Sequence, residues 1–69
     1  MFPWHIFLWI PKDWYAIGFT KGDQRRAVGF TKKEWDSYVS FFERQMAARQ
    51  EFNYDETWEV VSARDPERE

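Results

Sequence analysis

Residues 16–21 of this chain read AIGFTK, and residues 27–32 repeat them almost unchanged as AVGFTK. A polar stretch with Gly22-Asp23 at its centre separates the two copies. A glycine in that position supplies the positive φ that a tight two-residue hairpin turn requires. We therefore predict that the two copies belong to paired antiparallel strands, residues 14–20 and 25–30.

A turn at Gly22-Asp23 also fixes the register of the hairpin, because it decides which residues face each other. The bulky pairs are Ile17 with Val28, Phe19 with Arg26 and Tyr15 with Phe30, and the small pairs are Gly18 with Ala27 and Ala16 with Gly29. Bulky and small pairs alternate along the hairpin. One face of the predicted sheet is therefore bulky and the other nearly bare.

A first strand is predicted over residues 4–10, and Pro11 ends it because proline cannot continue a central ladder. A two-residue turn at Lys12-Asp13 would place Phe7 and Trp9 over the bare face. A three-residue loop would move them to the opposite face. We favour the two-residue turn, because large rings over glycine and alanine support a weak strand position.

A helix is predicted over residues 32–50, and Thr31 with Glu34 forms a capping box at its start. One apolar stripe along this helix is predicted to be its core face: Trp35, Tyr38, Val39, Phe42 and Met46. Phe41 and Ala48 lie outside the stripe and are predicted to be exposed.

Residues 57–63 alternate as an edge strand does, with Trp58 and Val60 on one side. The predicted fold class is therefore α+β, an antiparallel three- or four-stranded sheet packed on one helix in the order β-β-β-α-β. We predict a single domain over residues 1–63. Residues 64–69 contain no apolar side chain and are predicted to be a mobile charged tail.

Composition limits the classes of protein to which the chain can belong. Its 69 residues include no cysteine, so neither a disulfide nor a thiolate metal site supports the small core. Aromatic residues make up 22% of the chain, more aromatic surface than one small layer hides. The formal net charge of −2 predicts no general attraction to nucleic acid. The apolar start is too short for a membrane span and lacks a basic leader, which predicts a cytoplasmic protein.

Catalytic motifs are absent from the sequence. It has no glycine-rich phosphate loop, nucleophile elbow, zinc spacing or dinucleotide fingerprint. His5 is the only histidine, and it has no partnered nucleophile. We therefore predict that the protein is not an enzyme and uses no cofactor and no metal.

The bare face of the sheet is the predicted partner-binding surface. Large rings there border a floor of glycine and alanine, and such an exposed aromatic patch usually marks an interface. The residues expected to contact a partner are Phe7, Trp9, Trp14 and Arg25, with Phe41 from the helix. The alternative is that the last strand or the tail folds over this face and completes an ordinary core. An open face predicts a homodimer at micromolar concentration.

Residues 14–46 resemble the strand, turn, strand and helix of the arm-type DNA-binding domains of phage integrases and of plant ethylene-response-factor domains. In both families a run like residues 26–34, RAVGFTKKE, stands where the last strand enters a capped helix. The resemblance implies a three-stranded antiparallel sheet against a helix, and recognition of duplex DNA by basic residues on the open sheet face. Here Arg25 is the basic residue of that face, and phosphate contacts dominate affinity for DNA, so nucleic acid is a disfavoured partner.

The predicted function is a non-enzymatic protein-binding module. In kind it is similar to small phage-encoded inhibitors or adaptors that act on a host enzyme or a defence complex. One alternative is nucleic-acid binding, with Trp9 and Trp14 stacking on single-stranded bases and five basic residues on the phosphates: Lys21, Arg25, Arg26, Lys32 and Lys33. A second alternative is a carrier that holds a small ligand in an aromatic pocket at a dimer seam. No membrane partner is expected.

Overall fold

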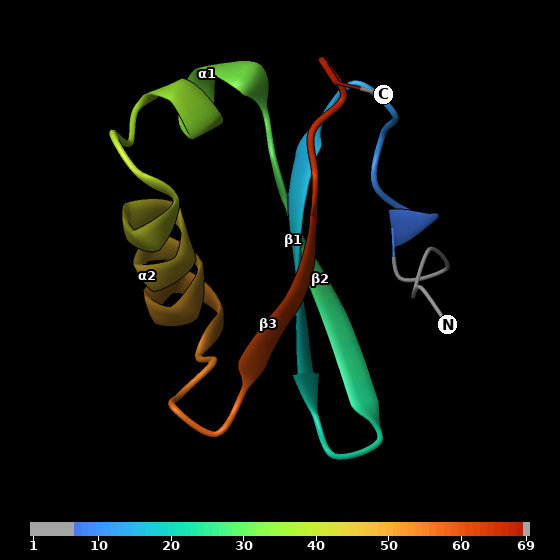
Figure 1. The fold of residues 1–69 in the computed structure, drawn as a ribbon, viewed down its shortest axis with the longest axis vertical. Helices are drawn as coiled ribbons and strands as arrows, with labels where there is room; N and C mark the ends of the chain where they lie inside the picture. The colour runs from blue at the N-terminus through green and yellow to red at the C-terminus, as the bar shows by residue number, and fades with distance from the viewer. Residues whose placement is uncertain (1–6, 69) are drawn as a thin grey trace.

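The computed structural model describes residues 7–68, and a β-hairpin forms its centre (Figure 1). Strand β1, Tyr15–Lys21, and strand β2, Gln24–Phe30, pair antiparallel across the turn at Gly22-Asp23. Gly22 has a φ of 60°, in the left-handed region that favours glycine. The register predicted from the repeat is confirmed for every pair, bulky and small.

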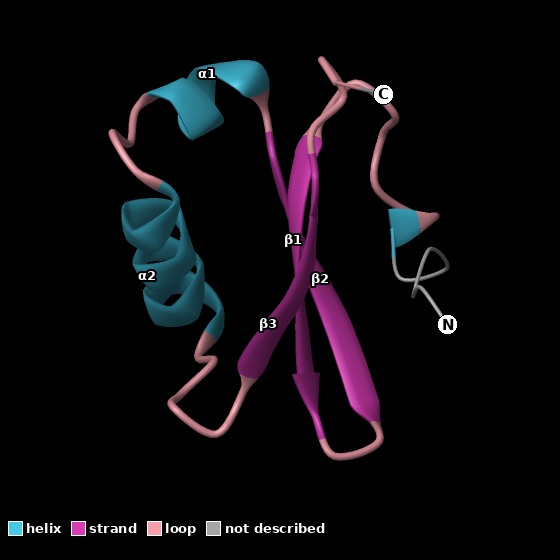
Figure 2. Ribbon diagram, viewed as in Figure 1, coloured by secondary structure: helices cyan, strands magenta, loops and turns pink. Residues whose placement is uncertain are grey.

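Strand β3, Glu59–Arg64, pairs antiparallel with the other side of β1, so the strand order is β2-β1-β3 (Figure 2). The α+β fold class with a three-stranded antiparallel sheet is therefore confirmed. The edge position predicted for the last strand is also confirmed. Trp58 and Val60 pack together against the core, as their spacing predicts.

The strand predicted at residues 4–10 is wrong over the part that the structure describes. Residues 7–10 form a turn, in which the Ile10 amide donates a hydrogen bond to the Phe7 carbonyl at 3.0 Å. Residues 4–6 lie outside the described residues. The position beside β1 is already filled, because β2 pairs with one side of β1 and β3 with the other. The segment before the hairpin therefore packs on a face of the sheet and does not join its ladder.

The single helix predicted at residues 32–50 is two helices, α1 at Lys32–Asp36 and α2 at Phe41–Phe52. The predicted capping box at the start of α1 is confirmed, with the Thr31 hydroxyl accepting from the Glu34 amide and the Glu34 carboxylate accepting from the Thr31 amide. A second cap, at Ser40, starts α2. The chain therefore ends one helix and begins another within the predicted span.

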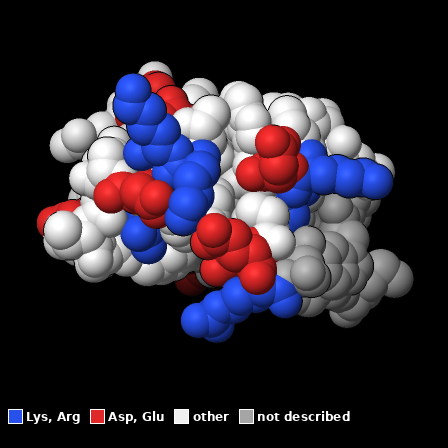
Figure 3. Space-filling model, turned by 90° about the horizontal axis from the view of Figure 1, so that it is seen from above, with Lys and Arg blue, Asp and Glu red and all other residues white. Residues whose placement is uncertain are grey.

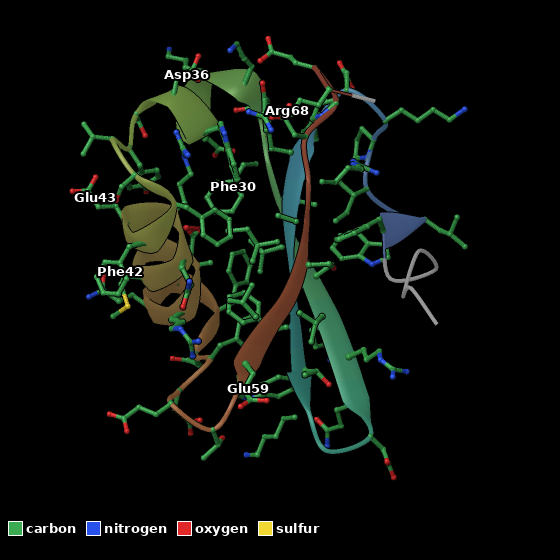
Figure 4. The ribbon with its side chains drawn as sticks, in the orientation of Figure 1. Phe30, Asp36, Phe42, Glu43, Glu59 and Arg68 are labelled. Carbon is green, nitrogen blue, oxygen red and sulfur yellow. The ribbon has the colours of Figure 1, made fainter. Side chains whose placement is uncertain are left out.

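The break between the helices overturns the predicted core stripe. Trp35 and Tyr38 pack against the core, but Val39, Phe42 and Met46 are 88%, 66% and 41% exposed. Phe42 points away from the sheet (Figure 4). The prediction that Ala48 is exposed is also wrong, since Ala48 is a buried residue of α2 that belongs to the larger core cluster. The cause is the turn at residues 37–40, because α2 does not continue the helical phase of α1.

Both faces of the sheet are covered by apolar side chains. The helix side holds the larger cluster, Tyr15, Ile17, Phe19, Val28, Phe30 and Ala48. The opposite side holds the smaller cluster, Phe7, Ile10, Ala16 and Ala27, with Trp14 packed against it. The segment 7–14 therefore covers part of the face that we predicted to be open. Within residues 7–68, no helix combines the length and the apolar composition that crossing a membrane requires.

Thr31→Ala is expected to lower the free energy of unfolding by about 1 kcal/mol, because the Glu34 amide loses the hydroxyl that caps it. Urea denaturation followed by circular dichroism measures this loss. Thr31→Ser keeps a capping hydroxyl and is the control. If Thr31→Ala lowered the free energy of unfolding no more than Thr31→Ser does, the capping hydroxyl would not contribute to stability.

Phe42→Ala is expected to change the free energy of unfolding by no more than about 0.5 kcal/mol, because the ring is largely exposed. The apolar stripe predicted along residues 32–50 would instead place Phe42 in the core, where its truncation would lower the free energy of unfolding by about 3–5 kcal/mol. The same urea titration separates the two values. A loss in the larger range would mean that α2 packs on the sheet through Phe42.

Candidate protein-binding site

The outer edge of β2 is open to a further strand, because within residues 7–68 β2 pairs with β1 alone. Hydrogen-bonded pairs alternate along an antiparallel ladder, starting here from the Lys21–Gln24 pair beside the turn. The N–H and C=O groups of Ala27 and Gly29 therefore point away from β1. The Arg25 carbonyl, which points the same way, accepts a hydrogen bond from the Arg26 side chain at 2.9 Å.

Two cavities meet at this edge. The first, of about 240 Å³, lies between β2 and α2, and Tyr38, Ala48 and Glu51 are among its lining residues. The second, of about 210 Å³, lies on the side of the segment before the hairpin, and its lining includes Trp9, Ile10, Pro11 and Ala27. Four residues line both cavities: Trp14, Val28, Gly29 and Phe52. The outer edge of β2 therefore has a hollow on each face of the sheet.

The segment before the hairpin lies directly on β2. A Cβ added at Gly29 would meet Ile10 Cγ2 and Trp14 Cε3, each at 3.1 Å. A Cβ at 3.1 Å would require these side chains to shift by a few tenths of an ångström, so the absence of a side chain at Gly29 lets the Trp14 ring lie against the strand. Trp14 thereby forms a wall shared by the two cavities.

Arg64 holds the segment before the hairpin, residues 7–14, on the sheet through hydrogen bonds to its backbone. Its guanidinium donates to the Trp14 carbonyl at 2.9 and 3.2 Å, and to the carbonyls of Pro11 and Phe7. The guanidinium also lies over the Phe7 ring, 5.7 Å from its centroid. Arg64 is buried and is the last residue of β3, so the tail predicted at residues 64–69 begins too early. The mobility of the tail stays a prediction, and Glu69 lies outside the described residues.

The structure brings three of the five predicted partner-binding residues to the edge of β2. Trp9 lines the second cavity, Trp14 lines both, and Arg25 is exposed on β2 itself. The predicted exposure of Phe7 is wrong: its side chain is 3% exposed, because it packs under Arg64 in the smaller cluster. Phe41 lines neither cavity and instead contacts Trp35 edge-on, with 6.3 Å between the ring centroids.

Phe52 lines both cavities, although the sequence did not predict it as a partner-binding residue. It is the last residue of α2, and the helix ends after it because Asn53 adopts a left-handed conformation with a φ of 60°. Asparagine is, after glycine, the residue most often found at such a helix end. Asn53 was therefore the sequence signal that could have extended the predicted helix to residue 52.

The basic residues proposed for nucleic-acid binding fall into two groups at opposite ends of β2. Lys21, Arg25 and Arg26 lie at the hairpin end, and Lys32 and Lys33 follow the other end of the strand. Lys32 is already paired with Asp36 and Glu67, at 3.1 and 3.3 Å. Acidic side chains lie beside basic ones on the face seen from above (Figure 3). The structure therefore does not gather the five cations into one site.

Tyr15 links the C-terminal residues to the sheet. Its hydroxyl donates to a Glu67 carboxylate oxygen at 2.5 Å, and the Lys32 ammonium lies close to the same carboxylate. The hydrogen bond from Tyr15, followed by the one from Lys32, lowers the pKa of Glu67. The same hydrogen bond raises the pKa of Tyr15.

The lowered pKa of Glu67 predicts a pH dependence. A carboxylate with a folded pKa below its unfolded value stabilises the fold at neutral pH, and that stabilisation is lost as pH falls through the folded pKa. We expect an NMR titration to give a Glu67 pKa below the ordinary glutamate value. Tyr15→Phe should raise it. An unchanged pKa in that variant would mean that Tyr15 does not bond to Glu67 in solution.

No protein-family description, curated protein or solved structure matches this chain. Within residues 7–68, no three histidine or carboxylate side chains are grouped to hold a metal ion.

Proposed function

We propose that this chain is a non-enzymatic protein-binding module that contacts its partner along the outer edge of β2. The observation that supports the proposal most is the pair of cavities that meet at this edge and share Trp14 and Phe52. Aromatic residues around a desolvated hollow are typical of the centres of protein interfaces. A role as an inhibitor or adaptor, a homodimeric state and a cytoplasmic location remain predictions.

Trp9 is the anchor that we expect a partner to bury. Its side chain is 68% exposed although it lines the second cavity, so the free protein leaves much of the ring in water. A tryptophan that becomes buried on binding contributes more than most interface residues. It contributes little to folding while it stays exposed.

Trp9→Ala therefore separates binding from folding. The control is Leu8→Ala, because Leu8 is the adjacent residue, is 82% exposed and lines neither cavity. The partner is first captured from a lysate of the source cells and purified, and its affinity for each variant is then measured by calorimetry.

We expect Trp9→Ala to weaken binding by more than about tenfold, which corresponds to about 1.4 kcal/mol. Leu8→Ala should leave the affinity unchanged. The free energy of unfolding of both variants should lie within about 1–2 kcal/mol of the wild-type value. Equal affinities for wild type and Trp9→Ala would contradict the proposal. A Trp9→Ala variant that unfolds would show that Trp9 belongs to the core.

A further inference from the structure

We infer that the partner contributes an extended segment that pairs with β2 as an added antiparallel strand, places apolar side chains in both cavities and sets carboxylates beside Arg25. This inference rests on the proposed function and specifies the chemistry of the partner. It follows from three features of the edge: its unpaired backbone, its hollow on each face, and its charge.

The backbone of β2 provides the first feature. Ala27 and Gly29 direct their N–H and C=O groups outward, and within residues 7–68 no second strand pairs with them. An extended segment that adds to such an edge gains main-chain hydrogen bonds whatever its sequence. Its own backbone would lie about 4.8 Å from β2, the usual spacing between strands.

The cavities provide the second feature. Successive side chains of a strand point to opposite faces of the sheet. The first cavity lies on the Val28 side, toward α2, and the second lies on the Ala27 side, toward Trp9. Neighbouring side chains of an added strand would therefore enter different cavities. A flat ligand on one face would fill only one of them.

Charge provides the third feature and distinguishes a foreign segment from a second copy of this chain. Residues 21–33, which contain β2 and its flanks, include five cationic side chains and one carboxylate. Antiparallel pairing of two copies through β2 would set Arg25 of each copy opposite the end of the other β2, and β2 contains no carboxylate to pair with it. Arg25 and Arg26 take part in no ion pair within residues 7–68, so they can receive carboxylates.

We expect the carboxylates of the partner segment at only one of its two ends. Arg25 lies near the start of β2, whereas Glu34 and Glu51 line the first cavity near the end of the strand. In an antiparallel pair, the carboxyl end of the added strand lies beside the start of β2. The partner segment is therefore apolar in its centre and acidic at its carboxyl end.

The probe is a blocked peptide of seven residues, the length of β2, with valines and isoleucines in its centre and aspartates at its carboxyl end. Two further peptides carry N-methyl groups on every second residue. One is methylated at the odd-numbered positions of the peptide and the other at the even-numbered positions. Only one set of amides in an added strand faces β2, so one methylated peptide should lose at least about tenfold in affinity and the other should bind as the parent does. Fluorescence anisotropy with the full chain measures the three affinities.

A charge swap tests the acidic end. A matched peptide with lysines in place of the aspartates should bind the wild type more weakly, and Arg25→Glu should reverse this preference. Equal losses for both methylated peptides, or no binding of the acidic peptide, would overturn strand addition. The proposed function would still stand if the captured protein bound in a manner that depends on Trp9. Concentration-dependent self-association of the chain alone, if the unmethylated peptide abolished it, would identify a second copy as the occupant and overturn the inference.

Discussion

Arg64→Met is expected to lower the free energy of unfolding by about 2–3 kcal/mol, because the carbonyls of Phe7, Pro11 and Trp14 lose their hydrogen bonds to a charged donor. The Phe7 and Pro11 carbonyls keep the backbone amides of Ile10 and Trp14 as donors, so the Trp14 carbonyl is the acceptor that the substitution affects most. Methionine keeps much of the length of the side chain and removes the guanidinium. Urea denaturation followed by tryptophan fluorescence measures the loss.

The control for this substitution is Arg68→Met. The Arg68 side chain is 87% exposed, and within residues 7–68 its ion pair is with Asp65, at 3.7 Å. Its loss should cost less than about 0.5 kcal/mol. If Arg64→Met and Arg68→Met lowered the free energy of unfolding equally, Arg64 would not be the residue that holds the segment 7–14 on the sheet. Arg64→Met should also weaken partner binding under conditions in which it stays folded, because Trp9 and Trp14 lose their support.

Phe19→Ala is expected to cost about 3–5 kcal/mol, because it empties the centre of the larger core cluster. The Phe19 side chain is fully buried, its ring centroid lies 4.7 Å from that of Tyr54, and the Arg49 guanidinium lies 5.3 Å from it. A domain of this size has a total stability of only about 3–10 kcal/mol. We therefore expect a largely unfolded protein at 37 °C, measured by circular dichroism and by the loss of dispersion in an NMR spectrum.

Phe42→Ala is the matched control for Phe19→Ala, because the same substitution is made at an exposed position. The contrast between the two tests which phenylalanine belongs to the core. Nearly equal losses would contradict the arrangement of the helices over the sheet.

The hairpin could be predicted from the sequence because its signals are local. The repeat, the turn at Gly22-Asp23 and the capping box at Thr31 all act within a few residues, and each is confirmed. The start of α2 had a local signal as well. Ser40 and Glu43 have the same spacing as Thr31 and Glu34, and the Ser40 hydroxyl caps the Glu43 amide. Recognising that cap would have divided the predicted helix correctly.

The first strand could not be predicted correctly because its place depends on a competitor far along the chain. β3 occupies the side of β1 that residues 4–10 were expected to take. The relative stabilities of a local pairing and of a non-local pairing with β3 decide which segment joins the ladder, and the alternation of side chains within one segment does not contain that information.

The candidate site was predictable by residue type but not by arrangement. Trp9, Trp14 and Arg25 stand out as aromatic and cationic residues near a bare sheet face, and all three lie along the edge of β2. The role of Arg64 depends on carbonyls that are 50 to 57 residues away in the chain. Its position in a charged run instead suggested a solvated tail.

Amide hydrogen exchange of the full chain, with and without the captured partner, tests the central claim most directly. If the partner binds along the outer edge of β2, exchange at Ala27 and Gly29 should slow by more than about tenfold, since their amides gain a hydrogen-bond acceptor. The Val28 amide already faces β1 and is the control on the same strand. Unchanged exchange at Ala27 and Gly29, with protection instead around Phe42 and Met46 on α2, would contradict the account.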